Sequence, residues 1–199
     1  MSTARNSIGS VGVFCGSSAA APSAWLGAAA QFGRMLANDG VRLVYGGGGN
    51  GLMGACARAA CGAGGQVLGV IPQFLVGAEN PIPEVPTEVV PSMHARKQRM
   101  FEESDGFAVL PGAVGTLEEA IEILSWRRLG LHSKPIVFLS PGGFWSPLFA
   151  QFTRFIDHSL SPEELLHCVS EVETPEDILP TLRAADPGIA VALHMPTRT

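Results

Sequence analysis

Lysine is scarce in this sequence of 199 residues, which contains only Lys97 and Lys134. Lysine and arginine together number 13 against 18 acidic residues, and the formal net charge is −5. The cations form no extended basic tract of the kind that binds the phosphate backbone of nucleic acids. We therefore expect no nucleic-acid partner.

Long apolar runs are also missing. No stretch is both long enough and free enough of polar residues to span a bilayer, and residues 1–7 lack the basic-then-apolar layout of a signal peptide. Apolar residues nevertheless make up 46% of the chain and charged residues 16%, which is not the composition of a disordered protein. The sequence predicts a folded, cytoplasmic protein without a membrane partner.

Cysteine is present only at Cys15, Cys56, Cys61 and Cys168, and no two of these residues have CxxC spacing. Cys15 and Cys168 lie in apolar runs. Buried free thiols are therefore a better interpretation than zinc ligands or disulfides. We expect no metal site.

Short apolar runs alternate with longer runs of helical spacing along the chain. The alternation predicts one α/β domain over residues 1–199, with a doubly wound, mostly parallel sheet and helices on both faces. Residues 1–10 and 187–199 are expected to be flexible termini. The predicted strands are residues 11–15, 41–45, 66–71, 106–110, 134–139 and 169–172, and helices are predicted for residues 23–38, from 117 to about 128, and 144–158.

The stretch from Leu110 to Glu119 reads as the end of a strand, a glycine turn and the start of a helix. The first N–H groups of a helix have no partner within the helix, and the helix dipole is positive there, so this junction predicts an anion site. Gly112 and Gly115 would let the backbone approach a ligand closely. An alternative remains open, because Thr116 and Glu119 also have the spacing of a structural capping box.

Two further glycine loops follow predicted strands. Gly16 and Ser17 follow the first strand, and residues 46–54 contain the G-x-G-x-x-G spacing twice, with candidate ligand contacts at Gly46, Gly47 and Gly48. A dinucleotide cofactor is disfavoured, because the glycines follow the second strand and no acid follows the next one to bind a ribose. Since parallel strands end at one edge of a sheet, the three loops predict a nucleoside monophosphate ligand.

Residues 72–91 are rich in proline and predict a long irregular loop that forms a lid or a wall of the site. Glu79, its first acid, either faces the ligand or is a solvated carboxylate. Beyond the loop, Ser92 is a candidate helix N-cap, and the helix that follows contains three cations, Arg96, Lys97 and Arg99. Such a cluster suits contact with phosphate.

These motifs carry a family resemblance. Residues 111–119, Pro-Gly-Ala-Val-Gly-Thr-Leu-Glu-Glu, resemble the PGGxGTxxE motif of the LONELY GUY family, whose members are cytokinin riboside 5′-monophosphate phosphoribohydrolases, many of them once labelled lysine decarboxylases. Residues 93–97 resemble the arginine-lysine motif of that family. The resemblance extends over roughly residues 11–156, with one departure, Ala113 in place of the second glycine.

The resemblance implies a Rossmann-like fold, a homodimer, and neither a metal nor a redox cofactor. It implies hydrolysis of the N-glycosidic bond of an N6-modified adenosine monophosphate to the free base and ribose 5-phosphate. By motif position, Arg96 and Glu119 match the catalytic pair. The matching substrate contacts are Glu79, Lys97, Gly112, Ala113, Val114, Gly115, Thr116, Leu117, Glu118 and Ser125.

Three other functions compete with this interpretation. A decarboxylase would need a lysine for pyridoxal phosphate, which Lys97 and Lys134 suit poorly. A non-enzymatic carrier of a nucleotide-like ligand would keep the glycine loops but would not need Glu119. A hydrolase of AMP or of another nucleoside monophosphate would use the same motifs.

The alanine at position 113 bears on each of these functions. It is harmless if its φ is negative, and its backbone is strained if φ is positive.

Overall fold

Seven parallel strands form one sheet in the computed structural model of the chain, which describes residues 7–185. The strands are β1 (Ser10–Phe14), β2 (Arg42–Tyr45), β3 (Val67–Pro72), β4 (Thr87–Val90), β5 (Gly106–Val109), β6 (Ile136–Leu139) and β7 (Ser170–Val172). Their order is β4-β3-β2-β1-β5-β6-β7, and every neighbouring pair is parallel. The predicted doubly wound α/β fold is confirmed.

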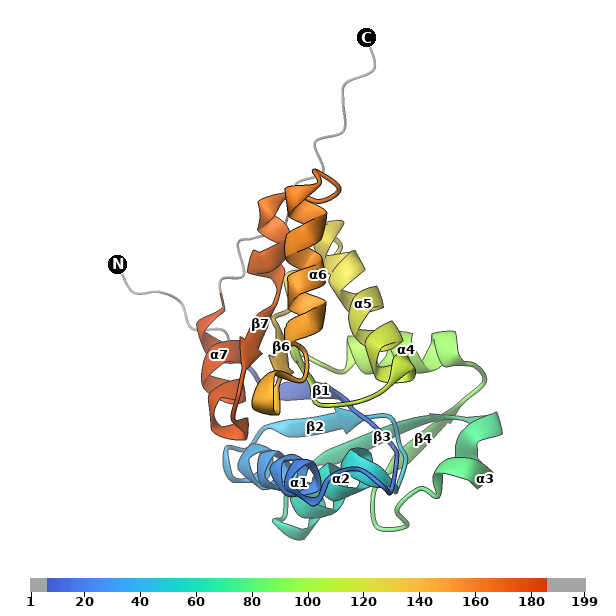
Figure 1. Cartoon of the computed structure of the whole chain (residues 1–199). Helices are drawn as coiled ribbons and strands as arrows, with labels where there is room; N and C mark the ends of the chain where they lie inside the picture. Colours follow the sequence, from blue (N-terminus) through green and yellow to red (C-terminus); the bar gives the residue numbers. More distant parts are fainter. Residues whose placement is uncertain (1–6, 186–199) are drawn as a thin grey trace.

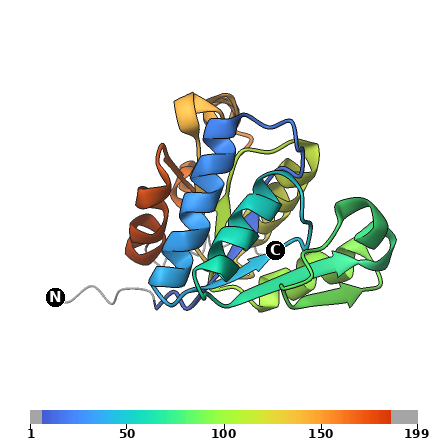
Figure 2. The same cartoon turned by 90° about the horizontal axis from the view of Figure 1, so that it is seen from below.

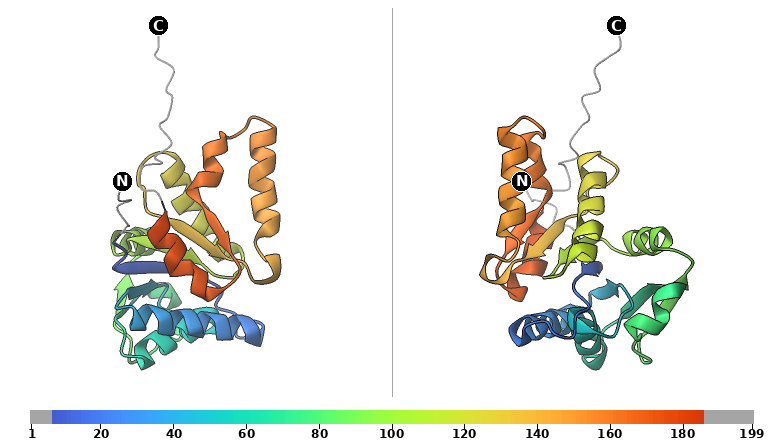
Figure 3. Two further views of the ribbon diagram at one scale, coloured as in Figure 1. Left: turned by 90° about the vertical axis from the view of Figure 1, so that its left-hand side faces the viewer. Right: turned by 45° about the vertical axis from the view of Figure 1, so that its right-hand side comes forward.

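Helices cover both faces of this sheet (Figure 1). One face packs against α1 (Ser23–Asn38), α2 (Gly51–Gly62) and α7 (Ile178–Ala184), and the other against α4 (Met93–Glu102), α5 (Val114–Arg128) and α6 (Ser146–Asp157). Figure 2 shows α1 and α2 side by side across the first face. Figure 3 shows from two more directions that α5 and α6 stand on the opposite side.

The alternation of side chains along β5 explains why one strand serves two cores. Phe107 and Val109 are buried against α4, α5 and α6, whereas Ala108 is buried against the layer of α1, α2 and α7. Successive side chains of a strand point to opposite faces, so a strand covered on both sides must be apolar throughout. Each large side chain buried in this way contributes roughly 1.5–3 kcal/mol of transfer free energy.

The strand order reverses between β1 and β5, which makes the carboxyl ends of these two strands the switch point of the sheet. Loops that leave such a point diverge and open a crevice. Here the loops are tied together at their bases, because the amide of Gly16 donates to the carbonyl of Pro111 at 3.0 Å and the amide of Leu52 donates to the carbonyl of Gly16 at 3.0 Å.

The prediction that residues 72–91 form an irregular loop is wrong in part. The segment contains a 3₁₀ turn (Gln73–Leu75), the short helix α3 (Val76–Glu79) and the strand β4, which pairs with β3 from Gly69 opposite Thr87 to Pro72 opposite Val90. Four residues among prolines give a weak strand signal. An edge strand with a half-exposed face, such as β4, also lacks the apolar continuity of a central one.

The expected flexible termini lie mostly outside the described residues, which exclude 1–6 and 186–199. The part of 1–10 that is described is fastened to the fold. Ile8 is buried, the amides of Gly9 and Ser10 each donate to Oδ2 of Asp105 at 2.9 Å, and Ser10 begins β1.

Candidate active site

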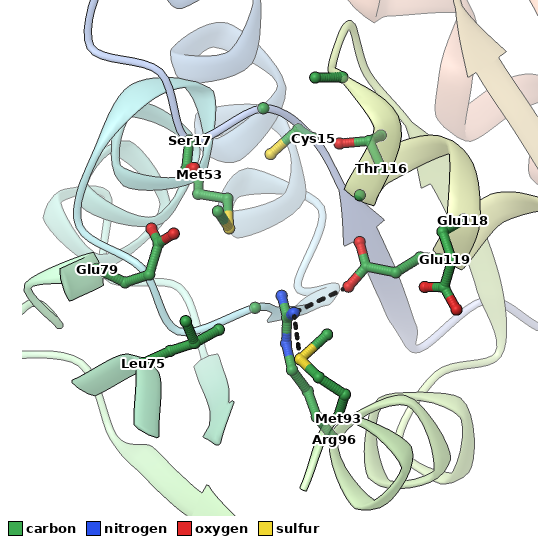
Figure 4. A pocket seen from close by; sticks show the side chains of 14 residues that line it. Cys15, Ser17, Met53, Leu75, Glu79, Met93, Arg96, Thr116, Glu118 and Glu119 are labelled. Atoms are coloured by element: carbon green, nitrogen blue, oxygen red, sulfur yellow. Dashed lines mark hydrogen bonds and ion pairs between the residues drawn. The ribbon is translucent and has the colours of Figure 1, made fainter. Parts of the chain in front are cut away.

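A cleft of about 250 Å³ lies at the carboxyl ends of β1, β2 and β5 (Figure 4). Loops after these strands form its walls together with α2, α3, α4 and α5. The lining residues are Cys15, Gly16, Ser17, Gly46, Met53, Leu75, Glu79, Met93, Arg96, Ala113, Gly115, Thr116, Glu118 and Glu119.

Arg96 and Glu119 meet in the middle of this cleft. Nη1 of Arg96 lies 3.1 Å from Oε1 of Glu119, and their side chains are only 9% and 7% exposed. The contact is an ion pair without hydrogen-bond geometry, since neither Oε1 of Glu119 nor Nε of Arg96 has a hydrogen-bond partner among the described residues. A buried polar atom without a partner is costly. The pair therefore retains bonding capacity for a polar ligand.

The start of α4 places Arg96. Ser92 is the N-cap, as predicted, and its hydroxyl accepts from the amide of Ala95 at 3.1 Å, so α4 begins at the cleft and Arg96 lies within its first turns. The guanidinium then passes over Gly46, where a Cβ would lie 1.9 Å from Nη2. Gly46 is thus needed to leave room for Arg96 and not only for the approach of a ligand.

The N-terminus of α5 opens into the same cleft. Its N-cap is Ala113, and the amide of Leu117 donates to the carbonyl of Ala113 at 3.0 Å as the first bond of the helix. The amides of Val114, Gly115 and Thr116 precede that bond, so the helix itself offers them no acceptor. Together with the helix dipole they favour an anion at this point.

The capping-box alternative is wrong. Thr116 lies within α5 and is buried, and the N-cap Ala113 has no side-chain capping bond. Because the helix begins two residues before Thr116, the carboxylate of Glu119 faces Arg96 and not the amide of Thr116. Ala113 has φ −100°, so it fits this backbone without strain.

Burial and charge set the proton affinity of the site. Burial raises the pKa of Glu119 above the ordinary value for glutamate, and the neighbouring Arg96 opposes that rise. Burial also raises the pKa of Cys15 well above its usual range, with further contributions from Cys56 and Glu119. The Cys15 thiol is therefore a neutral wall of the cleft at pH 7.

Glu79 lies across the cleft from Glu119, with Arg96 between the two carboxylates (Figure 4). Its Oε2 is buried without a hydrogen-bond partner among residues 7–185. The backbone fixes its place, since the carbonyl of Glu79 accepts from the amide of Gly49 at 2.7 Å. A Cβ at Gly48 would lie 2.8 Å from that same Oε2. The interpretation of Glu79 as a solvated loop carboxylate is wrong.

Some of the residues expected to contact a ligand do not line the cleft. They are Gly47, Gly48, Lys97, Gly112, Val114, Leu117 and Ser125. Gly112 is a close approach point, because a Cβ there would lie 2.2 Å from Oγ1 of Thr116. Lys97 binds two carboxylates of α5, and Ser125 lines separate grooves on the outer side of α5.

Sequence reasoning missed four lining residues, Cys15, Met53, Leu75 and Met93. The apolar run around Cys15 predicts a buried thiol and does not indicate that it lines a cleft. Met53 lies in the glycine motif of residues 46–54 and Met93 in the motif of residues 93–97. Their proximity to predicted site residues in these motifs was a signal that they line the cleft. Leu75 has no signal of its own, because the 3₁₀ turn that contains it lies in a proline-rich segment without a regular pattern.

All four cysteines are free, with Cys15, Cys56 and Cys168 buried as predicted and Cys61 only half-buried. Over residues 7–185, no group of three or more His, Cys, Asp or Glu side chains is placed to hold a metal ion. No helix in that range is long and apolar enough to cross a membrane.

The fold and cleft define a doubly wound α/β protein with its site at the switch point of the sheet. Residues 53–182 match the family described as "Possible lysine decarboxylase". The chain is 42% identical over 151 residues to the probable cytokinin riboside 5′-monophosphate phosphoribohydrolase LOGL1 of Oryza sativa subsp. japonica, covering 75% of this chain and 68% of that protein. It is 35% identical over 184 residues to LOG of the same species, covering 91% and 75%. The chain therefore belongs to the LONELY GUY family.

Solved structures agree with the fold. The molybdenum cofactor carrier protein of Chlamydomonas reinhardtii superposes with a TM-score of 0.66 at 23% identity, over 86% of this chain and 93% of that one. A molybdenum cofactor binding protein of Rippkaea orientalis gives a TM-score of 0.63 at 23% identity, over 86% and 93%. At this identity the similarity concerns the architecture alone.

Proposed function

We propose that this protein hydrolyses the N-glycosidic bond of N6-modified adenosine 5′-monophosphates and releases the free cytokinin base and ribose 5-phosphate. The observation that carries the proposal is the buried Arg96–Glu119 pair beside the open N-terminus of α5. The names of the family relatives support the reaction, since LOGL1 and LOG are described as phosphoribohydrolases of cytokinin riboside 5′-monophosphates.

The 5′-phosphate would bind at the N-terminus of α5. The amides of Gly115 and Thr116, which both line the cleft, supply donors, and Gly115 has no side chain to obstruct them. Oγ1 of Thr116 stands beside Gly112 at the base of the same loop. This end of the cleft can select a phosphorylated substrate over the free riboside.

Glu119 would act at the ribose. As the bond between C1′ and the base breaks, the base leaves with the electron pair and positive charge builds on the ribose ring. A buried carboxylate stabilises that charge and orients a water, whose oxygen adds to C1′ while its proton goes to the departing base. Burial raises the Glu119 pKa, and the guanidinium of Arg96 opposes that rise and so favours the ionised carboxylate.

The base would lie toward the apolar walls of the cleft. Met53 and Leu75 line it on the side of Glu79, and Met93 lines it beside Arg96 (Figure 4). Thioethers adapt to the shape of an aromatic ring and make favourable contacts with it. Glu79, with its unpartnered Oε2, is available to a polar group of the nucleoside.

The homodimer implied by the family is part of the proposal. Ser125, a family substrate contact, lies in a groove between α5 and α6 with Ile121 and Phe155, outside the cleft of its own chain. Leu160 lines this groove and Val114 lines a second groove that also contains Ser125; these two side chains expose 76% and 81% of their surface. A second copy docked there would cover this apolar surface and account for Ser125.

The test is release of base from isopentenyladenosine monophosphate, with AMP and the unphosphorylated riboside assayed in parallel. Release from the monophosphate alone, and not from the riboside, is the expected result. Equal release from AMP would reassign the protein to a general nucleoside monophosphate hydrolase. Tight binding of the monophosphate by calorimetry without any release would support a carrier instead and contradict the proposal.

A further inference from the structure

Two neighbouring residues of α4 make separate contacts with α5. Arg96 reaches Glu119 inside the cleft, whereas Lys97 reaches two other carboxylates. Nζ of Lys97 lies 2.5 Å from Oε1 of Glu118 and 2.9 Å from Oε2 of Glu122. Glu118 and Glu122 are one helical turn apart and share a face of α5. A single ammonium therefore bridges two points of that helix.

The lysine end of this bridge is buried, whereas the carboxylates of Glu118 and Glu122 are 52% and 27% exposed. The Lys97 side chain is 11% exposed, and the residue does not line the cleft. Burial lowers the pKa of Lys97, but its contacts with the carboxylates of Glu118 and Glu122 more than compensate, so its pKa lies above the ordinary value. The charged ammonium donates a hydrogen bond to Glu118 and forms an ion pair with Glu122. It is poorly placed to bind a phosphate in the cleft.

We infer that Lys97 is a positioning residue, which holds α4 against α5 through Glu118 and Glu122 and thereby sets the Arg96–Glu119 pair. Arg96 and Lys97 are consecutive on α4, and their partners Glu119 and Glu118 are consecutive on α5. The Lys97 contact therefore fixes both the distance between the two helices and their rotation at the Arg96–Glu119 pair. The expected effect of Lys97 on turnover rests on the proposed function. Its expected effect on the position and pKa of Glu119 does not depend on that function.

The charges around Glu119 make the inference testable. From α4, Arg96 and Lys97 lower its pKa, whereas from its own helix Glu118 and Glu122 raise it. From the loop after β1, the neutral thiol of Cys15 faces the same carboxylate. Without the charge of Lys97, Arg96 would remain as the cation that lowers the Glu119 pKa, against Glu118 and Glu122, which raise it.

The experiment compares Lys97→Met with Lys97→Arg and with Arg99→Met. Arg99 is the matched control, because it is a cation of the same helix whose partners, Glu88 and Glu103, lie outside the cleft. We expect Lys97→Met to lower kcat by about tenfold, to leave KM within about twofold, and to move the acid limb of the kcat–pH profile to higher pH. Lys97→Arg should restore most of kcat, and Arg99→Met should match the wild type.

A second readout does not need turnover. In protein labelled with ¹³C at the glutamate carboxyls, the Glu119 resonance is identified by its loss in Glu119→Gln and titrated by NMR. We expect Lys97→Met to raise the Glu119 pKa by roughly half a unit or more, and Glu122→Gln to lower it. Arg99→Met should leave it unchanged. If Lys97→Met does not fold, Lys97→Gln, which keeps a polar side chain of similar length but removes the charge, takes its place in both readouts.

Two results would overturn the inference. One is an unchanged Glu119 pKa in both Lys97→Met and Glu122→Gln. The other is a raised KM with kcat and the acid limb unaltered, which would make Lys97 a phosphate contact. A wild-type protein that releases no base, but whose Glu119 titration responds as expected, would refute the proposed function and leave the positioning role of Lys97 intact.

Discussion

Replacing Gly46 by alanine should disable the cleft while the fold survives. A Cβ at this position would lie 1.9 Å from Nη2 and 3.0 Å from Cζ of Arg96, and real Cβ contacts do not come closer than 3.0 Å. The guanidinium must therefore move by about 1.1 Å. Because a misplacement of about 1 Å in a catalytic group can reduce the rate by about 10²-fold, we expect kcat/KM to fall about 100-fold.

The fold should tolerate the change, because the clash is with the end of a flexible side chain that borders the open cleft. Gly62→Ala is the matched control, since Gly62 ends α2 and a Cβ there would meet nothing within 4 Å. Base release measured as kcat/KM, with a thermal melt of each variant, separates the two effects. A Gly46→Ala protein with kcat/KM within about threefold of wild type would refute the claim that the position of Arg96 matters to about 1 Å.

Four further predictions concern the same cleft. Glu119→Ala should abolish base release and keep its circular dichroism spectrum, so a folded and active variant would contradict the mechanism. In the wild type, turnover should be lost as pH falls through the pKa of Glu119. Burial holds that pKa above the ordinary value of about 4.3. Arg96→Ala should lose far more activity than Arg99→Ala, because Arg99 pairs with carboxylates outside the cleft, and equal losses in parallel assays would undo that assignment. Ala113→Gly should leave kcat/KM within about threefold, since Ala113 already has a φ of −100°, whereas a large gain would show that the loop needs glycine in the bound state.

Much of the fold could be predicted from the sequence. The central strands are short apolar runs because both faces of the sheet are covered, and runs of this kind place β1, β2, β3, β5 and β6 within about two residues. The edge strand β4 was harder to predict. β4 has only four residues, follows three prolines and leaves Val89 50% exposed, so neither length nor periodicity marked it.

The candidate site was predictable where the backbone defines it. The glycine loops and the start of a helix near Thr116 follow from local residue types, and the structure brings Gly16, Gly46 and Gly115 to one cleft. Ala113 shows the limit of this reasoning, since only the observed φ decides whether alanine is tolerated. Leu75 shows it as well, because no local pattern tells an apolar turn residue that faces a ligand from one that faces the core.

The partners of charged side chains depend on helix packing, which local sequence does not encode. Arg96 and Lys97 are adjacent in one motif and look equally suited to phosphate. On α4, however, consecutive residues point about 100° apart. One rotation of the helix therefore sends Arg96 into the cleft and Lys97 against α5. That rotation is fixed by Met100, buried against the sheet, and by the Ser92 cap at the start of α4. The chemistry of the pair thus depends on apolar packing one turn away from it.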